Sequence, residues 1–387
     1  MPEDHSANGK AAVERREETV DRPERGGELP HFTTRRLVQT LIVVVALLLV
    51  IYFLVPKLVG LGDALSRLDE ADPLWIAVAI GFSVLAFATY IALFKAVVGG
   101  DALRLRWVET YEINMAGVAA TRLFSAGGAG GIALTYWALR KAGMGRRDVA
   151  RRMVAFLSLQ YAFYPIALIV FGVLLRTGVL NGKNSVELTI VPAAVAGVFL
   201  ILGTLIALIP RDLESRLSHF AHGERAEAFL HTAAKVPETL AEGFRFALSL
   251  FAHPSRGGLA VLGAAGFWAA SIGVLWASFH AFGTHVPLAV VVQGFFLGMV
   301  ANLFPLAPAG VGAVDAGMIG AFVLFGIPEQ TVFPAILTFR LIAFWMPIPP
   351  GVIAFLQLRK TVHRWEDEGL PIDRGGKGRS DLEPAVR

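Results

Sequence analysis

Five polar side chains lie within or at the ends of long apolar stretches of this chain. They are Arg122, Arg152, Asn302, Asp315 and Arg340. A charge in apolar surroundings is costly unless it has a partner, so such residues usually face one another or a polar pathway. The arginine guanidinium is a rigid, planar fork that matches the oxygens of a phosphate. The set therefore indicates the binding of an anionic group.

The residue types needed for catalysis or metal binding do not gather anywhere in the sequence. Cysteine is absent, which excludes disulfides, thiolate nucleophiles and cysteine-based metal sites, and the 9 histidines are scattered singly. No long loop carries paired carboxylates or a nucleophile with its base. A Gly-x-x-x-x-Gly-Lys-Ser/Thr loop for ATP is also missing. We therefore expect no catalytic residue, no metal, no cofactor and no enzyme activity.

The composition places the chain in a bilayer. Its 387 residues are 55% hydrophobic and 17% charged, with a mean hydropathy of +0.59, which is far more apolar than a soluble domain. Segments of about 20 apolar residues are long enough to cross the hydrocarbon core. The predicted spans are Leu37–Val59, Leu74–Val98, Met153–Leu175, Leu188–Ile209, Gly257–Phe282 and Thr331–Leu358.

Two further apolar regions, Trp107–Leu139 and Pro287–Gly326, are broken at their centres by glycine or proline. Each consists of two pieces of about 12–18 residues, which suit re-entrant hairpins or broken helices better than full spans. Glycine allows the unusual backbone angles of a reversal and proline tolerates a helix end. Short full spans, and glycines that serve only close helix packing, remain open. The predicted turn residues are Gly127, Gly128, Gly130, Gly131, Pro305, Pro308, Gly310 and Gly312.

The two interrupted regions resemble each other when Arg122 is aligned with Asn302. The matches are Leu123/Leu303, Phe124/Phe304, Ala129/Ala309, Gly130/Gly310 and Ala133/Ala313. Charged loops place the entrance of the first region on the cytoplasmic side and that of the second outside, so the copies are inverted. Secondary transporters use this arrangement to bind substrate between two halves. We therefore expect an all-α polytopic membrane protein with six full transmembrane helices, two broken or re-entrant helical hairpins and an inverted 3+3 repeat.

Basic residues set the predicted orientation. The segments assigned to the cytoplasm carry 28 of the 35 Lys and Arg residues, so both termini are predicted to be cytoplasmic in a cell (inner) membrane. The two ends are rich in charge and glycine and are predicted to be disordered. The expected boundaries are tails at 1–36 and 361–387, a membrane domain at 37–360 with repeats at about 37–176 and 188–358, and inner-face helices at 211–256.

Each candidate binding residue has a structural alternative. Arg340 and Arg152 are expected near opposite leaflets, where each could hold a phospholipid headgroup. Alternatively, Arg152 snorkels to the interface and Arg340 forms a structural ion pair with Asp315. Asp315 could neutralise an arginine in the unloaded protein or carry a coupling proton. Arg122 lies at the mouth of the first hairpin, with Asn302 as a polar helper of the second.

These motifs resemble a known family. The C-terminal signature of the lysylphosphatidylglycerol synthase transmembrane region, also called the flippase-like domain family, is similar to "NLFPLAPAGVGAVDAGMIGAFVLFGIP" and "FRLIAFWMPIPPGVIAFLQLRK". Its earlier Gly-rich motif resembles "RLFSAGGAGGIALTYWALRKAGM". Many members have Glu at the position of Asp315 and a Pro-Gly-Arg turn in place of "SAGGAGG". The resemblance places Asn302, Pro305, Gly310, Gly312, Asp315, Arg340 and Pro347 on the family's motif positions.

The resemblance implies lipid handling. In bifunctional members this region precedes a soluble transferase that loads lysine from charged tRNA onto phosphatidylglycerol, and the membrane part is implicated in moving the lipid between leaflets. Since the chain ends at Arg387 without such a domain, we expect translocation of an anionic phospholipid or lipid-linked headgroup without synthesis. The alternatives are a membrane-embedded transferase, or an anchor for a separate lipid-modifying synthase. The expected partner is a membrane phospholipid, with that synthase or a homo-oligomer left open and no nucleic acid.

Overall fold

The computed structural model describes residues 70–99, 103–123, 129–208, 239–300 and 313–370, and within these ranges the regular structure is helical. The predicted first span, Leu37–Val59, the N-terminal tail and the tips of both interrupted regions lie outside the described residues. The helices are α4 (Pro73–Val98), α5 (Trp107–Leu123), α6 (Ala129–Lys141), α7 (Arg146–Arg176), α8 (Val186–Ala207), α11 (Pro254–Ala281), α12 (Leu288–Val300), α13 (Ala313–Leu324), α14 (Glu329–Arg340), the π-helix η4 (Leu341–Trp345) and α15 (Ile348–Glu368).

Five helical segments of the described chain are long and apolar enough to cross a membrane. They correspond to the predicted spans that fall within the described residues, so the expectation of a multi-pass helical membrane protein is confirmed. The last of them combines α14, η4 and α15, so the predicted span Thr331–Leu358 contains an interruption that sequence analysis did not anticipate. The segments are Pro73–Val98, Arg146–Arg176, Val186–Ala207, Gly257–Ala281 and Glu329–Trp365.

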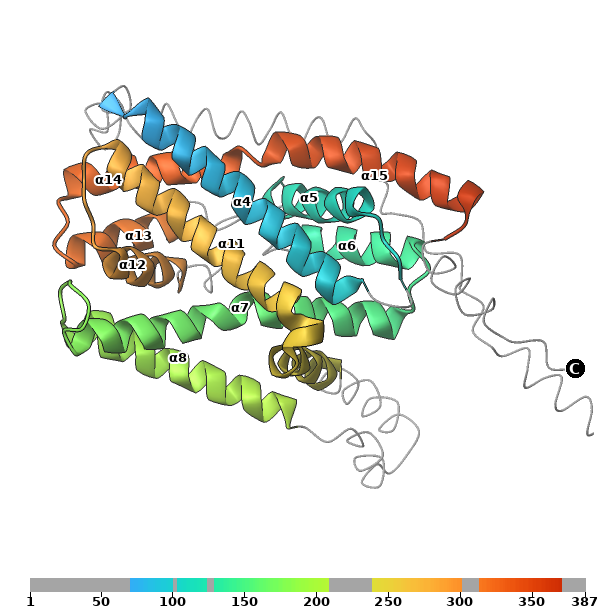
Figure 1. Cartoon of the computed structure of the whole chain (residues 1–387), viewed down its shortest axis with the longest axis horizontal. Coiled ribbons are helices and arrows are strands. Elements are labelled where there is room, and N and C mark those ends of the chain that lie inside the picture. Colours follow the sequence, from blue (N-terminus) through green and yellow to red (C-terminus); the bar gives the residue numbers. More distant parts are fainter. Residues whose placement is uncertain (1–69, 100–102, 124–128, 209–238, 301–312, 371–387) are drawn as a thin grey trace, which may run out of the picture.

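Helices α4 and α11 form the most extensive contact and run side by side through the middle of the molecule (Figure 1). Small residues on one face of α11 let the two backbones approach. A Cβ atom built at three of its glycines would lie within 2.9 Å of α4 atoms, so these positions have no room for a side chain. Packing of small residues replaces the hydrophobic driving force that is weak between helices in lipid. Gly263, Gly266 and Gly273 face Leu93, Thr89 and Phe82 in that order.

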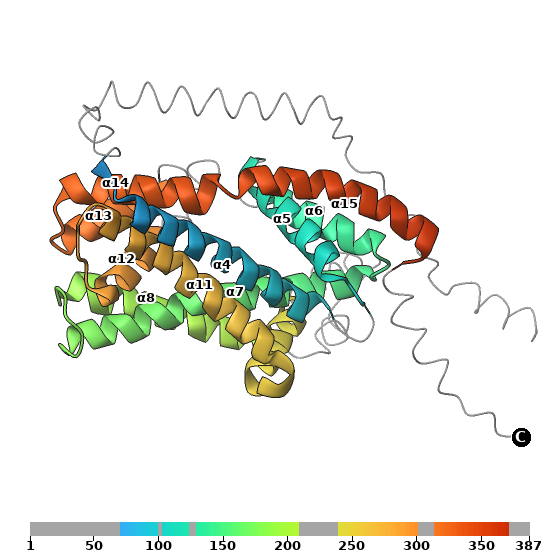
Figure 2. The same cartoon turned by 45° about the horizontal axis from the view of Figure 1, so that its top comes forward.

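Each interrupted region forms a pair of short helices, α5 with α6 and α12 with α13. Their lengths of 17, 13, 13 and 12 residues agree with the predicted short pieces. Each pair also packs against the long helix of the other half of the chain. Helix α5 contacts α15, and α12 contacts α7, as Figures 1 and 2 show from two directions. We refer to α4–α7 as the N-terminal half and to α8–α15 as the C-terminal half, in line with the predicted repeat boundaries.

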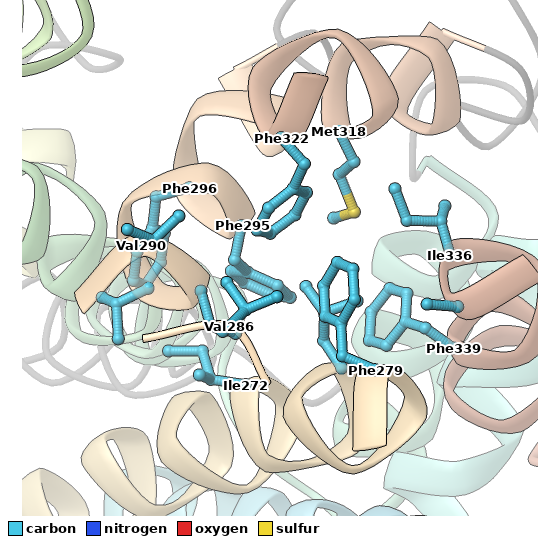
Figure 3. Packing of buried hydrophobic residues seen from close by; sticks show 14 of the residues in the cluster. Ile272, Phe279, Val286, Val290, Phe295, Phe296, Met318, Phe322, Ile336 and Phe339 are labelled. Atoms are coloured by element: carbon cyan, nitrogen blue, oxygen red, sulfur yellow. The ribbon is translucent and has the colours of Figure 1, made fainter. Parts of the chain in front are cut away.

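The described helices enclose two hydrophobic cores, and each core includes side chains from both halves. One gathers apolar side chains of α11–α14 with the far end of α7 and the start of α8, and the other gathers α4, α5 and α6 with α15. In the first core, phenylalanine rings from four helices meet (Figure 3). Neither core is complete without helices from both halves. The rings concerned are Phe279, Phe295, Phe296, Phe322 and Phe339.

Two predicted boundaries differ from the structure. The span predicted to begin at Met153 begins earlier: the basic stretch from Arg140 to Arg152 before it is largely helical, because Gly143 closes α6 with a φ of 96° and α7 already begins at Arg146. The predicted C-terminal tail begins too early at residue 361, since α15 continues to Glu368. Its last turns stay helical because Trp365 is buried against α5, where its Nε1 donates to Glu109 Oε1 at 3.0 Å. Of the expected inner-face helices, residues 239–252 are helical and 209–238 lie outside the described residues.

Gly131 tests the packing interpretation of the first glycine cluster. A methyl group there would overlap the Gly117 carbonyl and the Thr121 hydroxyl of α5, whereas one at Gly81 would meet nothing within 4 Å. We expect Gly131→Ala to destabilise the fold by about 1–3 kcal/mol, as overpacking does. Gly81→Ala, the matched control within a membrane helix, should leave stability unchanged or slightly raised. Thermal unfolding in nanodiscs measures both, and equal melting temperatures would show that α5 and α6 do not depend on this close approach.

Candidate anion-binding site

The long helix that ends the C-terminal half changes register just after Arg340. In η4 the Met346 N–H donates to the Leu341 carbonyl at 3.0 Å, a bond to the fifth residue back. Proline has no N–H, so it cannot serve the carbonyl one turn earlier. Pro347, Pro349 and Pro350 therefore remove three backbone donors directly after this turn.

Two consecutive carbonyls lose their helical partners as a result. Ile342 would bond to the Met346 N–H, which is taken by Leu341, and Ala343 would bond to the missing N–H of Pro347. An unpaired carbonyl costs several kcal/mol in a membrane, so another donor must reach it. Side chains of the N-terminal half supply these donors, as the following contacts show.

Ser83 of α4 and Arg122 of α5 donate to these two carbonyls and to the next one, that of Phe344. The Ser83 hydroxyl donates to the Ile342 carbonyl at 3.3 Å. The Arg122 guanidinium donates through Nη2 to the Ala343 carbonyl at 3.1 Å and through Nη1 to the Phe344 carbonyl. The sequence separation of these pairs exceeds 220 residues, so the contacts join the two halves of the chain.

Aromatic rings complete the surroundings of Arg122. Its guanidinium carbon lies 5.0 Å from the ring centroid of Phe344 and 5.4 Å from that of Phe87 on α4. Both distances are within the range of cation–π attraction. In the part of the chain that the structure describes, Arg122 is held by carbonyls and rings and forms no salt bridge with a carboxylate.

Arg340 lies on the same ring from the other side of the helix break. Its guanidinium carbon is 4.8 Å from the centroid of Phe344, and its Nε lies 2.9 Å from Asp315 Oδ1. The two side chains are 12% and 25% exposed, so the pair is partly shielded and still reachable. Arg340 ends α14 and Asp315 is in the first turn of α13, where a carboxylate is also favoured by the helix dipole. The structure thus contains the ion pair that sequence analysis held as the alternative for Arg340.

Three of the five polar residues singled out in the sequence therefore come together. Arg122, Asp315 and Arg340 gather around Phe344, and we call these four residues the arginine cluster. Asn302 lies outside the described residues. The charges of the three ionisable members sum to +1, which suits an anion.

Arg152 lies elsewhere. Its Nη1 donates to the carbonyls of Val97, Val98 and Gly99 at 2.9, 3.0 and 2.8 Å and so caps the C-terminus of α4. Along α4, Val97 is ten residues from Phe87, or about 15 Å. In this position a cation also opposes the negative end of the helix dipole. The cap is consistent with a structural role for Arg152, and its predicted role in headgroup binding stays a prediction.

Two of the predicted turn residues lie within the described part of the chain. Gly130 and Gly131 are in the first turn of α6, where Gly131 permits the contact with α5 described above. The remaining predicted turn residues lie outside the described residues. They are Gly127, Gly128, Pro305, Pro308, Gly310 and Gly312.

Sequence reasoning missed Ser83, Phe87 and Phe344. A serine and two phenylalanines in apolar helices carry no signal of their own. The prolines after η4 did provide a sequence signal, because three prolines within four residues imply backbone carbonyls that need donors from outside the helix. That reasoning predicts the need for donors but not the helix that provides them.

Comparison with known proteins settles the family. The chain matches the lysylphosphatidylglycerol synthase TM region over residues 37–351. This chain belongs to that family. The region is the non-catalytic part of the synthase. The resemblance noted in the two Gly-rich motifs and the "FRLIAFWMPIPPG" helix is thereby confirmed.

Two curated relatives match over shorter stretches. Both are UPF0104 membrane proteins of Methanothermobacter thermautotrophicus. One is 37% identical over 87 residues, which are 22% of this chain and 26% of the relative. The other is 33% identical over 79 residues, which are 20% of this chain and 24% of the relative. The matched stretches thus span about a quarter of each relative.

The ion pair between Arg340 and Asp315 can be tested by a double-mutant cycle. Arg340→Gln or Asp315→Asn leaves a partly buried charge without this partner, which costs about 3–5 kcal/mol in comparable pairs. We expect the double variant to lose less stability than the sum of the two singles. Arg147→Gln breaks the pair with Glu242, in which Arg147 is 67% exposed, and should cost less than about 1 kcal/mol. Unfolding in mixed micelles, followed by tryptophan fluorescence, gives the four values, and strict additivity would contradict the pairing.

Proposed function

We propose that this protein binds an anionic phospholipid or lipid-linked headgroup at the arginine cluster and passes it between the leaflets. The observation that carries the proposal is the meeting of two guanidinium groups, one from each half of the chain, on the ring of Phe344. Membership in a family of synthase membrane regions supports a lipid as the anion.

The donor geometry favours a phosphate. A guanidinium has five N–H donors, and Arg122 directs two of its nitrogens at the carbonyls of Ala343 and Phe344. The N–H groups beyond these two bonds can take phosphate oxygens in a charge-assisted fork. Asp315 lies against Arg340 and can give up that place to the headgroup. The carboxylate would then keep Arg340 neutralised between binding events.

Transport between leaflets requires two alternating arrangements, and the helix packing supports them. Helix α5 packs on α15 of the opposite half, and α12 packs on α7, so each interrupted region repeats the same relation. We propose that the halves are inverted copies of one 3+3 unit with two re-entrant hairpins. The arginine cluster lies where α4 and α5 of one half meet η4 of the other, which is the place that alternating access would open.

Orientation follows from charge. With both termini in the cytoplasm, the basic segments around Arg146 and Arg359 lie on the inner side, where anionic headgroups are enriched. We propose a location in the cell (inner) membrane on this ground. The helix 239–252 then lies on the inner face, tied to α7 by the 2.7 Å contact between Arg147 and Glu242.

Lipid binding and exchange can be measured in reconstituted vesicles. Liposomes of phosphatidylcholine with labelled phosphatidylglycerol should show exchange between leaflets that depends on the protein. Arg340→Gln and Arg122→Gln each remove a charged hydrogen-bond donor, worth about 1.5–3 kcal/mol, so binding should fall at least about tenfold. Arg176→Gln, an exposed arginine bonded to the Asn184 carbonyl, is the matched control and should behave as wild type.

The outcome also separates the alternative functions. Wild-type exchange rates in both Arg122→Gln and Arg340→Gln would contradict a headgroup site at the arginine cluster. Unchanged lipid traffic together with copurification of a synthase would favour the anchor. A covalently altered lipid would favour the transferase.

Membrane topology gives an independent test, since the absence of cysteine makes any introduced thiol unique. Gly145→Cys, between α6 and α7, should react only with reagents on the cytoplasmic side. Asn184→Cys and His285→Cys, both exposed, should react only from outside. If Gly145→Cys and Asn184→Cys label from one side, α7 does not span the membrane and the proposed inversion fails.

A further inference from the structure

We infer that Arg122 is a positioning residue that sets the angle between α14 and α15, and that a headgroup bound at the cluster acts on this angle through it. The inference rests on the proposed function for the identity of the anion. Its structural part concerns the break at η4, where three successive carbonyls receive their hydrogen bonds from side chains of the other half.

The break separates two packed groups of helices. Helix α14 packs on α11 and α13, whereas α15 packs on α5, where Gly351 faces Ala119 and the Met115 carbonyl. A π-helix next to prolines is a common place for a helix to bend, because fewer backbone bonds oppose the bend there. Motion at η4 therefore carries α15 with α5 relative to α14 with α11.

Arg122 spans this break. It belongs to α5, on the α15 side, and it bonds to the Ala343 and Phe344 carbonyls within the break itself. Arg340 is the last residue before the break, on the α14 side. An anion held by both guanidinium groups must therefore fix the position of one helix group relative to the other. Without the anion, Arg340 is paired with Asp315 on its own side of the break, so the charged bridge between the two helix groups is missing and the angle between them varies more widely.

The fork of arginine is required for this role. Arginine can bridge two adjacent carbonyls and keep its planar face on an aromatic ring at the same time. Lysine carries the same charge but presents it as a single point on one nitrogen. Arg122→Lys should therefore keep a positive charge at the cluster and lose the control of the angle.

A substitution of Pro347 has the opposite effect at the same contact. Pro347→Ala returns the N–H that the Ala343 carbonyl lacks, so the helix can satisfy this carbonyl internally and straighten. The angle should then no longer depend on Arg122. Pro350→Ala is the matched control, since it returns a donor to Met346, which Arg122 does not contact.

Spin labels at two introduced cysteines measure the angle directly. Gln330 on α14 and Gln357 on α15 are exposed and flank the break. In wild type, double electron–electron resonance should give a broad distance distribution in phosphatidylcholine nanodiscs that narrows when phosphatidylglycerol is included. The distance distribution of Arg122→Lys should stay broad in both lipids, and that of Pro347→Ala should be narrow in both. The distribution of Pro350→Ala should narrow with phosphatidylglycerol as in wild type.

The rate of phosphatidylglycerol exchange between leaflets provides a second test. We expect Arg122→Lys and Pro347→Ala each to slow phosphatidylglycerol exchange about tenfold, and the double variant to be no slower than either single variant, because both act on one contact. Three results would overturn the inference. The distance distribution of Arg122→Lys could narrow with phosphatidylglycerol as in wild type, or Pro350→Ala could change that distribution as strongly as Pro347→Ala. The effects of Arg122→Lys and Pro347→Ala on the exchange rate could also multiply in the double variant.

The measurements distinguish this inference from the proposed function. If wild type shows no lipid exchange but its distances still respond to phosphatidylglycerol through Arg122, translocation fails and the positioning role stands. If exchange occurs and depends on Arg340 while no variant changes the distances, the positioning role fails alone. Because the Pro347→Ala arm keeps both arginines, it remains informative if Arg122→Lys does not fold.

Discussion

Every backbone carbonyl buried in a membrane must find a donor, and this requirement governs the region around η4. Pro347 and a π-register turn leave the consecutive carbonyls of Ile342 and Ala343 without helical partners. Ser83 and Arg122 of the N-terminal half supply the missing donors. A local defect in one helix thereby becomes a polar connection between the two halves. The arginine cluster is a consequence, because the donor to Ala343 and Phe344 is a cation and brings its charge with it.

That charge shapes the chemistry of the site. Arg122 satisfies carbonyls and stacks on rings, whereas Arg340 is paired with Asp315, so the cluster carries more positive than negative charge. An excess of positive charge at this depth favours an anion over a neutral or cationic ligand. In the proposed mechanism, placement on a helix break also gives the ligand a mechanical role, because bound charge and helix angle depend on the same guanidinium groups. Binding and movement are then two aspects of one set of contacts.

The packing of the long helices explains why such a site can form. Glycines of α11 bring α4 within backbone contact, and α4 presents Phe87 to Arg122 as it crosses. Each pair of short helices rests on a long helix from the opposite half, so residues from both halves meet near the centre (Figure 2). The same small-residue packing holds α5 against α6 at Gly131 and α15 against α5 at Gly351. Arg152 and Trp365 stabilise helix ends around this arrangement without joining the cluster.

The sequence by itself determined the membrane class, the spans within the described residues, the two interrupted regions and the ion-pair option for Arg340 and Asp315. These features follow from hydropathy and from the cost of a charge in lipid, which act locally along the chain. Only the tertiary structure decided that Arg122 reaches η4, that Phe344 is shared by two arginines and that Arg152 caps α4 instead. These contacts join residues far apart in sequence, and the crossing of helices that creates them depends on packing between halves, which no local pattern encodes.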